Sequence, residues 1–127
     1  MAKVIGIGGI FFKSRDPKAL SAWYEQHLGM KVERFGGVKF AEDSSRPGST
    51  LWSPFKEDTT YFAPSDKPFM LNLRVDDLHA LLASLRAAGV QVDAKVDESE
   101  YGKFGWIMDP EGNRVELWQP PANAEGS

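Results

Sequence analysis

Two stretches of the chain carry the same series of structural signals, and this internal repeat limits the possible folds more than any other feature. In each stretch a β-prone run leads to an aspartate suited to cap a helix, and an amphipathic segment then ends at a glycine. The first helix begins after Asp16 and ends before Gly29, and the second begins after Asp77 and ends before Gly89. Because one copy alone could not cover its apolar faces, the sequence predicts two related halves that pack together.

The far ends of the two halves also match. Leu51-Trp52-Ser53-Pro54 aligns with Leu117-Trp118-Gln119-Pro120, which makes Thr50 the counterpart of Glu116. Three short β-prone segments follow each helix, so each half reads as strand, helix, strand, strand, strand. The expected strands of the first half are 4–13, 31–35, 38–42 and 49–53, with a loop at 43–48, and those of the second include 69–75, 90–96 and 114–119.

This pattern predicts an α+β fold in which two βαβββ modules form one curved, eight-stranded mixed sheet. The sheet would be a cup with both helices outside it. We expect a single domain over residues 1–127, with module 1 at 4–54, a connector at 55–67, module 2 at 68–120 and a flexible tail at 121–127. The connector contains Phe55, Tyr61 and Phe62, so it is either a lid over the cup or a loop pinned to the surface.

A hairpin near the C-terminus supplies the most informative side chain. The segment Asp109-Pro110-Glu111-Gly112-Asn113 has the residues of a tight turn, and the strand after it alternates with period two. Val115 and Leu117 share one face, whereas Arg114, Glu116 and Trp118 share the other. A helix-packed back face and a ligand-facing front would produce this pattern, and so would a solvated front.

The composition limits the functional classes. The chain has 127 residues, a formal net charge of −3 and no cysteine. The absence of a basic cluster argues against nucleic-acid binding, which depends on clustered lysine and arginine. Without cysteine there is no disulfide or thiolate site, and no apolar run is long enough to cross a membrane. We therefore expect a cytoplasmic protein whose partner is a small molecule.

The turn Asp109 to Asn113 with Glu116-Leu117 behind it, together with the first helix and its Trp23-Tyr24 and Leu28-Gly29 ending, resembles the vicinal oxygen chelate superfamily. That superfamily includes glyoxalase I, extradiol dioxygenases and bleomycin-resistance proteins. The resemblance covers nearly the whole chain, and it implies the paired-module cup and a homodimer.

The resemblance also implies a divalent metal held by four ligands on the first and last strands of the modules. Glu116 matches one ligand position, but Gly9, Thr50 and Met70 stand at the other three, and glycine and methionine offer neither oxygen nor imidazole. His27 and His79 belong to the outer helices. We therefore expect no cofactor, with a divalent metal only at an atypical site, for which the acidic run Asp93, Asp97, Glu98 and Glu100 is one candidate.

Alternation along the strands and an aromatic, basic segment at the cup entrance predict the residues that line the cup. Two repeat-related tryptophans would face each other there, across either a ligand cavity or a dry core. Glu116 would be a poised base, or it would form a salt bridge with Lys13, Arg74 or Arg114. The predicted ligand-binding residues are Phe11, Lys13, Thr50, Trp52, Met70, Asn72, Arg74, Tyr101, Lys103, Trp106 and Trp118.

The sequence thus predicts a glyoxalase- or bleomycin-resistance-like protein that binds a small, partly aromatic or amphipathic molecule in a metal-free or atypical cup. The alternative is an enzyme of the glyoxalase or dioxygenase kind, with Glu116 as a metal ligand or as a metal-independent base. A third possibility is a structural or interaction subunit, for which the cup would be filled.

Overall fold

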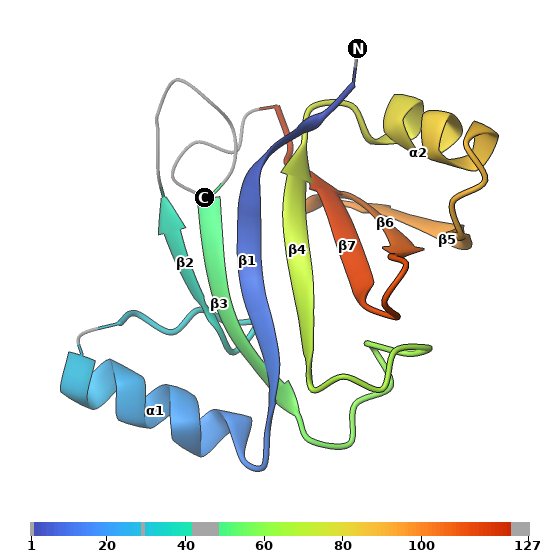
Figure 1. Ribbon diagram of the computed structural model, residues 1–127. Helices are drawn as coiled ribbons and strands as arrows, with labels where there is room; N and C mark the ends of the chain where they lie inside the picture. Colours follow the sequence, from blue (N-terminus) through green and yellow to red (C-terminus); the bar gives the residue numbers. More distant parts are fainter. Residues whose placement is uncertain (1, 29, 42–48, 123–127) are drawn as a thin grey trace.

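The computed structural model describes residues 2–28, 30–41 and 49–122, which form one mixed sheet and two helices (Figure 1). The predicted α+β class is confirmed. The loop expected at 43–48 and most of the tail lie outside the described residues. The elements are β1 Val4–Ser14, α1 Pro17–Leu28, β2 Val38–Ala41, β3 Ser49–Lys56, β4 Phe69–Val75, α2 Leu78–Ala87, β5 Val92–Ser99, β6 Gly102–Met108 and β7 Arg114–Gln119.

Among the described residues the sheet has seven strands rather than the predicted eight, in the order β2-β3-β1-β4-β7-β6-β5. β1 and β4 are antiparallel neighbours at the centre, and each is flanked by a parallel partner, β3 or β7. The outer pairs, β2 with β3 and β7 through β6 to β5, are antiparallel. Both helices pack on one face of this sheet, α1 through Trp52 of β3 and α2 through Leu117 of β7, and the connector packs on the other face.

The segment 31–35 was predicted as a strand, but among the described residues it contributes only an isolated bridge between Val32 and Val38. A tight turn explains the difference, because Gly36 N–H donates to the Glu33 carbonyl and Glu33 N–H donates to the Gly37 carbonyl. Gly36 has φ of 97°, a conformation that favours glycine.

Two strands are longer than the sequence indicated. β3 continues through Pro54 to Lys56, where the connector was expected. β2 pairs with β3 only as far as Trp52, so the proline lies where β3 has a free edge and needs no ladder donor. β5 runs to Ser99, beyond the predicted end at 96, so Asp97 and Glu98 of the acidic run lie in this strand.

Both predicted helix caps are confirmed. The Asp16 carboxylate accepts a hydrogen bond from Ala19 N–H, and the Asp77 carboxylate accepts one from Ala80 N–H, each at 3.1 Å. Behind the second half of the sheet, α2 packs on the back of β7. This core consists of Val75, Leu78, Leu82, Val115 and Leu117, as the alternation of β7 predicted.

The connector covers the face of the sheet opposite the two helices. Phe62, which lies in it, is 1% exposed and packs with Phe11, Met70 and Trp106 in a second buried cluster. Lys13 N–H donates to the Pro68 carbonyl, and the Lys67 ammonium donates to the Asn113 side chain, so contacts near its C-terminal end hold the connector in place. Part of the cup is therefore occupied by a segment of its own chain.

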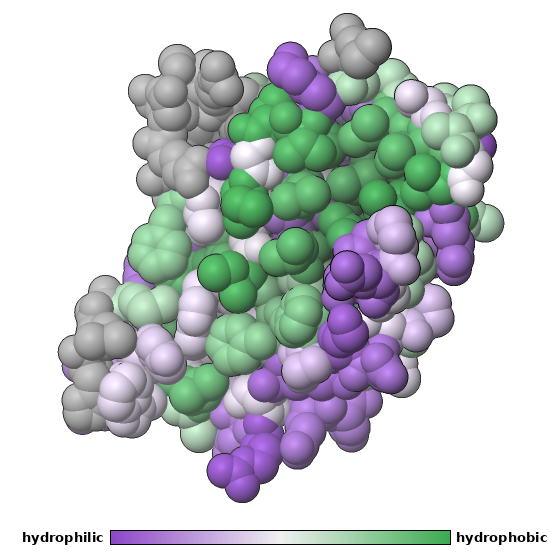
Figure 2. Space-filling model, in the orientation of Figure 1, coloured by the Kyte–Doolittle hydropathy of each residue, from purple (hydrophilic) through white to green (hydrophobic). Residues whose placement is uncertain are grey.

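A strip of hydrophobic surface runs along β1 and β4 between the two helices (Figure 2). Its residues are 42–56% exposed although they lie on the central strands: Val4, Ile7, Ile10, Phe69 and Leu71. Of the helices that the structure describes, none has the length and hydrophobicity that crossing a membrane requires.

Candidate functional site

The side chain of Glu116 is 1% exposed, and three other side chains donate hydrogen bonds to it. Asn72 Nδ2 donates to Oε1 at 2.5 Å, and Trp106 Nε1 donates to Oε2 at 3.0 Å. The hydroxyl of Tyr61 donates to the same Oε2. None of these partners carries a charge, so Glu116 is a buried carboxylate held by neutral donors rather than by a cation.

Strand register brings this group together. β4 runs parallel to β7 with Asn72 beside Glu116, and β6 runs antiparallel to β7 with Trp106 beside Glu116. Gly8 provides the space for Asn72, because a Cβ atom at Gly8 would lie 1.7 Å from Asn72 Oδ1. Tyr61 alone reaches the site from outside the sheet, since it belongs to the connector.

Burial raises the pKa of the Glu116 carboxyl above its usual range, because the charged form loses its hydration. The three hydrogen bonds and the positive charge of Arg114 act in the opposite direction, but burial prevails. Burial and the neighbouring Glu116 carboxylate also raise the pKa of the Tyr61 hydroxyl, so this hydroxyl keeps its proton at neutral pH.

Aromatic rings surround the Tyr61–Glu116 pair. The ring of Tyr61 stacks on Phe55 with centroids 5.5 Å apart and meets Trp106 edge-on at 6.1 Å. Phe62 packs against Phe55. Tyr61 is nevertheless 38% exposed, so one edge of this aromatic box opens to solvent.

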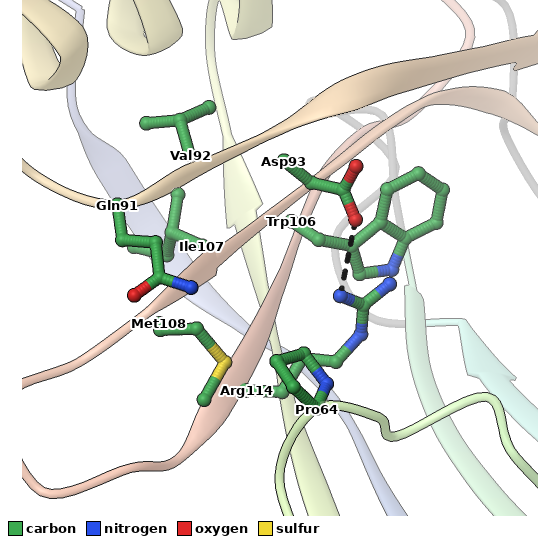
Figure 3. Close-up of a pocket in the computed structure, with 8 residues that line it drawn as sticks. All are labelled: Pro64, Gln91, Val92, Asp93, Trp106, Ile107, Met108 and Arg114. Carbon is green, nitrogen blue, oxygen red and sulfur yellow. Dashed lines mark hydrogen bonds and ion pairs between the residues drawn. The ribbon is translucent and has the colours of Figure 1, made fainter.

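A cleft of about 190 Å³ lies next to this box, on the β5–β6 side of the cup (Figure 3). Arg114 and Asp93 form an ion pair at 3.3 Å on one side of it, and Gln91, Ile107 and Met108 lie on the other. The guanidinium carbon of Arg114 is 5.2 Å from the centroid of the Trp106 ring. Trp106 therefore contacts both the cleft and Glu116.

Several predicted residues lie together on the cup face. Phe11, Met70, Asn72 and Trp106 are all buried around Glu116 or beside it. Trp118 is 6% exposed, stacks on Phe104 and donates to the Tyr101 carbonyl. Arg74 pairs with Trp118 across β4 and β7, farther along the same face.

Trp52 was predicted to line the cup, but it lies on the opposite face, where its ring packs on Tyr24 of α1 at 4.6 Å. The repeat alignment was displaced along the last strand. Phe11 pairs with Ser53 as Asn72 pairs with Glu116, so Ser53 rather than Thr50 occupies the position equivalent to Glu116. Thr50 and Trp52 are each an odd number of residues from Ser53, so their side chains face the opposite side of the sheet from Ser53. The two predicted tryptophans therefore do not face each other.

Two residues of the predicted entrance patch also lie elsewhere. Lys103 pairs with Gln119 and shares the face of β6 on which α2 packs, and Tyr101 is 61% exposed. Lys13 lies next to Phe55 of β3, and its backbone N–H holds the end of the connector.

Sequence reasoning missed Tyr61 as a partner of Glu116 and Arg114 as a wall of the cleft. The aromatic residues of the connector were a signal for a lid, but nothing local indicates which of them reaches Glu116. For Arg114 the signal was its place two residues before Glu116 on the same face.

The donor set around Glu116 does not fit a divalent cation. The carboxylate oxygens accept hydrogen bonds from an indole N–H, an amide N–H and a phenol hydroxyl, so hydrogen-bond donors stand where a cation would have to approach. In the part of the chain that the structure describes, no three His, Cys, Asp or Glu side chains gather as a metal site would require. The side chain of His27 lies outside the described residues, and His79 pairs with Glu98 at 2.7 Å.

The sequence profile of the glyoxalase-like domain family matches residues 9–118 of this chain. The chain belongs to this family. The predicted membership of the vicinal oxygen chelate superfamily is confirmed by this match and by the fold of the solved structures described next. No functionally curated protein matches the sequence.

Solved structures of this glyoxalase-like fold include a methylmalonyl-CoA epimerase in complex with methylmalonyl-CoA and NH4+, with 19% identity, a TM-score of 0.70, and coverage of 97% of this chain and 99% of the epimerase. The epimerase of Mycobacterium tuberculosis is 19% identical, with a TM-score of 0.62 and coverage of 93% and 89%. A glyoxalase/bleomycin resistance protein/dioxygenase superfamily member from Vibrio splendidus 12B01 is 14% identical, with a TM-score of 0.55 and coverage of 94% and 99%. At such low identities the likeness shows the fold alone.

Proposed function

We propose that this glyoxalase-like protein binds a small aromatic molecule that carries a hydroxyl or amino group, with Glu116 as the acceptor. The hydroxyl of Tyr61 supports the proposal, because it already donates to Glu116 Oε2 from within a box of aromatic rings. Tyr61 thus occupies the place of such a ligand, and the ligand would bind when the connector moves aside.

The surroundings of Tyr61 are suited to an exchange between the connector and a ligand. The Tyr61 ring is 38% exposed, so it can leave without first opening the core, whereas Phe62 beside it is 1% exposed. A phenol or an aromatic amine would replace both the stacking on Phe55 and the hydrogen bond to Glu116. A ligand that restores both interactions compensates for the loss of the Tyr61 contacts.

The experiment is a thermal-shift and calorimetric titration with p-cresol, which reproduces the side chain of tyrosine, and with aniline. Toluene is the matched control, because it has the ring of p-cresol without the donor. We expect p-cresol and aniline to bind wild-type protein more tightly than toluene, and the preference to shrink in Tyr61→Ala combined with Glu116→Leu. If p-cresol binds Tyr61→Ala but not wild-type protein, Tyr61 is a permanent structural plug and the proposal is wrong.

A second candidate function is proton transfer by Glu116 without a metal. The observation in its favour is the raised pKa of Glu116 together with its direct hydrogen bond to a hydroxyl. Such an enzyme would exchange an acidic carbon-bound proton of its ligand with solvent, whereas a sequestering protein would return the carbon-bound protons unchanged. Mass spectrometry of ligands incubated with the protein in D2O separates the two, with Glu116→Gln as the inactive control.

A further inference from the structure

We propose that the cleft beside Trp106 is a binding site for small carboxylates, with Arg114 as the residue that binds the anion. This inference does not rest on the proposed function, because it concerns a different ligand charge and a different polar residue. The cup could fail to bind phenols while the cleft still bound carboxylates.

Arg114 has unused capacity for an anion. Its side chain is 10% exposed, and among the described residues its one ion pair is a single contact of 3.3 Å from Nη1 to Asp93 Oδ2. Its Nε atom is buried and has no hydrogen-bond acceptor among the described residues. A guanidinium binds a carboxylate best through two parallel N–H donors, and Asp93 uses only one.

The rest of the cleft is suited to an apolar body attached to that carboxylate. Its walls are largely apolar side chains, while Gln91 adds one amide. A volume of about 190 Å³ corresponds to about six water-sized groups, which suits a short hydrocarbon chain or one ring. Pro64, Trp106 and Met108 contribute apolar side chains to the cleft, whereas Val92 and Ile107 border it while their side chains pack against the α2 core.

Asp93 now occupies the place that the ligand carboxylate would take. The side chain of Asp93 is 39% exposed, so it can turn towards solvent when a ligand arrives, whereas Arg114 is fixed in place over Trp106. The other carboxylate oxygen of Asp93, Oδ1, accepts a hydrogen bond from the Lys95 backbone N–H at 3.0 Å, and an asparagine at this position can still accept it. Asp93 is therefore a competitor for Arg114 that can be weakened without removing the anion-binding residue.

The test measures binding of benzoate, with benzamide as a neutral analogue of the same shape and inorganic phosphate as a different anion. Calorimetry gives Kd, and the Nε–H signal of Arg114 in ¹H–¹⁵N spectra locates the binding, because Trp106 borders both the cleft and the aromatic box. We compare wild-type protein with Asp93→Asn and with Asp97→Asn, which makes the same change of charge on the same strand outside the cleft. Arg114→Lys keeps the charge but loses the paired donors.

We expect wild-type protein to prefer benzoate to benzamide by at least about tenfold, as a charged hydrogen bond requires. Asp93→Asn should tighten benzoate binding severalfold, Asp97→Asn should not, and Arg114→Lys should weaken it. Destabilisation cannot explain a gain of affinity, so Asp93→Asn keeps the test valid even if Arg114→Lys unfolds. Equal binding of benzamide, an equal gain in Asp97→Asn or no gain in Asp93→Asn would overturn the proposal. Phosphate binding as tight as benzoate binding would overturn the carboxylate class.

Discussion

Replacing Glu116 with glutamine should remove a pH-dependent loss of stability that the buried carboxylate causes. In the unfolded chain this carboxyl group titrates near 4.5, and burial raises its pKa in the folded protein. Between these two pKa values the folded protein holds a proton that the unfolded chain has released. The free energy of unfolding of the wild-type protein therefore falls as the pH rises through this interval. Glu116→Gln has no such proton to lose.

The size of the effect follows from one proton. The free energy of unfolding of wild-type protein relative to Glu116→Gln should fall by up to about 1.4 kcal/mol per pH unit above about pH 4.5. It should level off above the folded pKa of Glu116. Urea denaturation of both proteins at intervals from pH 4 to pH 8 measures this difference directly.

Glu111→Gln is the matched control, since Glu111 is an exposed glutamate in the β6–β7 turn and carries the same change of charge without burial. A difference between wild-type protein and Glu116→Gln that stays flat with pH would refute the reasoning. So would a difference that rises with pH, because it would mean that the three hydrogen bonds outweigh the burial of the carboxylate.

Three further predictions concern the groups around the site and the outer face. Tyr61→Phe should lower the free energy of unfolding by about 0.5–1.5 kcal/mol, because it removes one hydrogen-bond donor. It should also extend the pH-dependent interval upwards, since the Tyr61 hydrogen bond lowers the pKa of Glu116, and an unchanged interval in the same urea series would contradict this. Gly8→Ala should destabilise the protein by more than about 2 kcal/mol, because its Cβ would overlap Asn72. The control Gly89→Ala, at φ of 83° with no atom within 4 Å, should cost about 1 kcal/mol, and equal melting temperatures of the two variants would contradict this. We also predict a homodimer in which the exposed strip of β1 and β4 meets the same strip of a second copy, because symmetric dimers pack self-complementary apolar patches. In sedimentation equilibrium Leu71→Lys should give monomers, whereas the control Ala83→Lys, on the exposed side of α2, should not. A monomeric wild-type protein would refute the prediction.

The sequence was sufficient where the structure depends on neighbouring residues. Asp16 and Asp77 were predicted as helix caps, and the alternation of Val115 and Leu117 with Glu116 was read correctly, because capping and strand alternation are local. The family was also evident from the turn Asp109 to Asn113 and the strand behind it. These features need only a few consecutive side chains.

Matching the two halves by residue type was less reliable. Leu51-Trp52-Ser53-Pro54 looks like Leu117-Trp118-Gln119-Pro120, but strand pairing places Ser53, not Thr50, in the position of Glu116. An alignment error of an odd number of residues reverses every side chain of a strand, and so Trp52 was assigned to the wrong face. Register is decided by the partner strand, which the residues of β3 do not encode alone.

By itself, the sequence determined an α+β domain of the glyoxalase-like family with one carboxylate, Glu116, directed inwards from its last strand. Only the tertiary structure decided that Tyr61 donates to this carboxylate and that Asp93 meets Arg114 in the neighbouring cleft. Residue periodicity determines which way a side chain points from its own element. Which group it then meets depends on how distant segments pack, because Tyr61 and Glu116 are brought together only when the connector closes over the sheet.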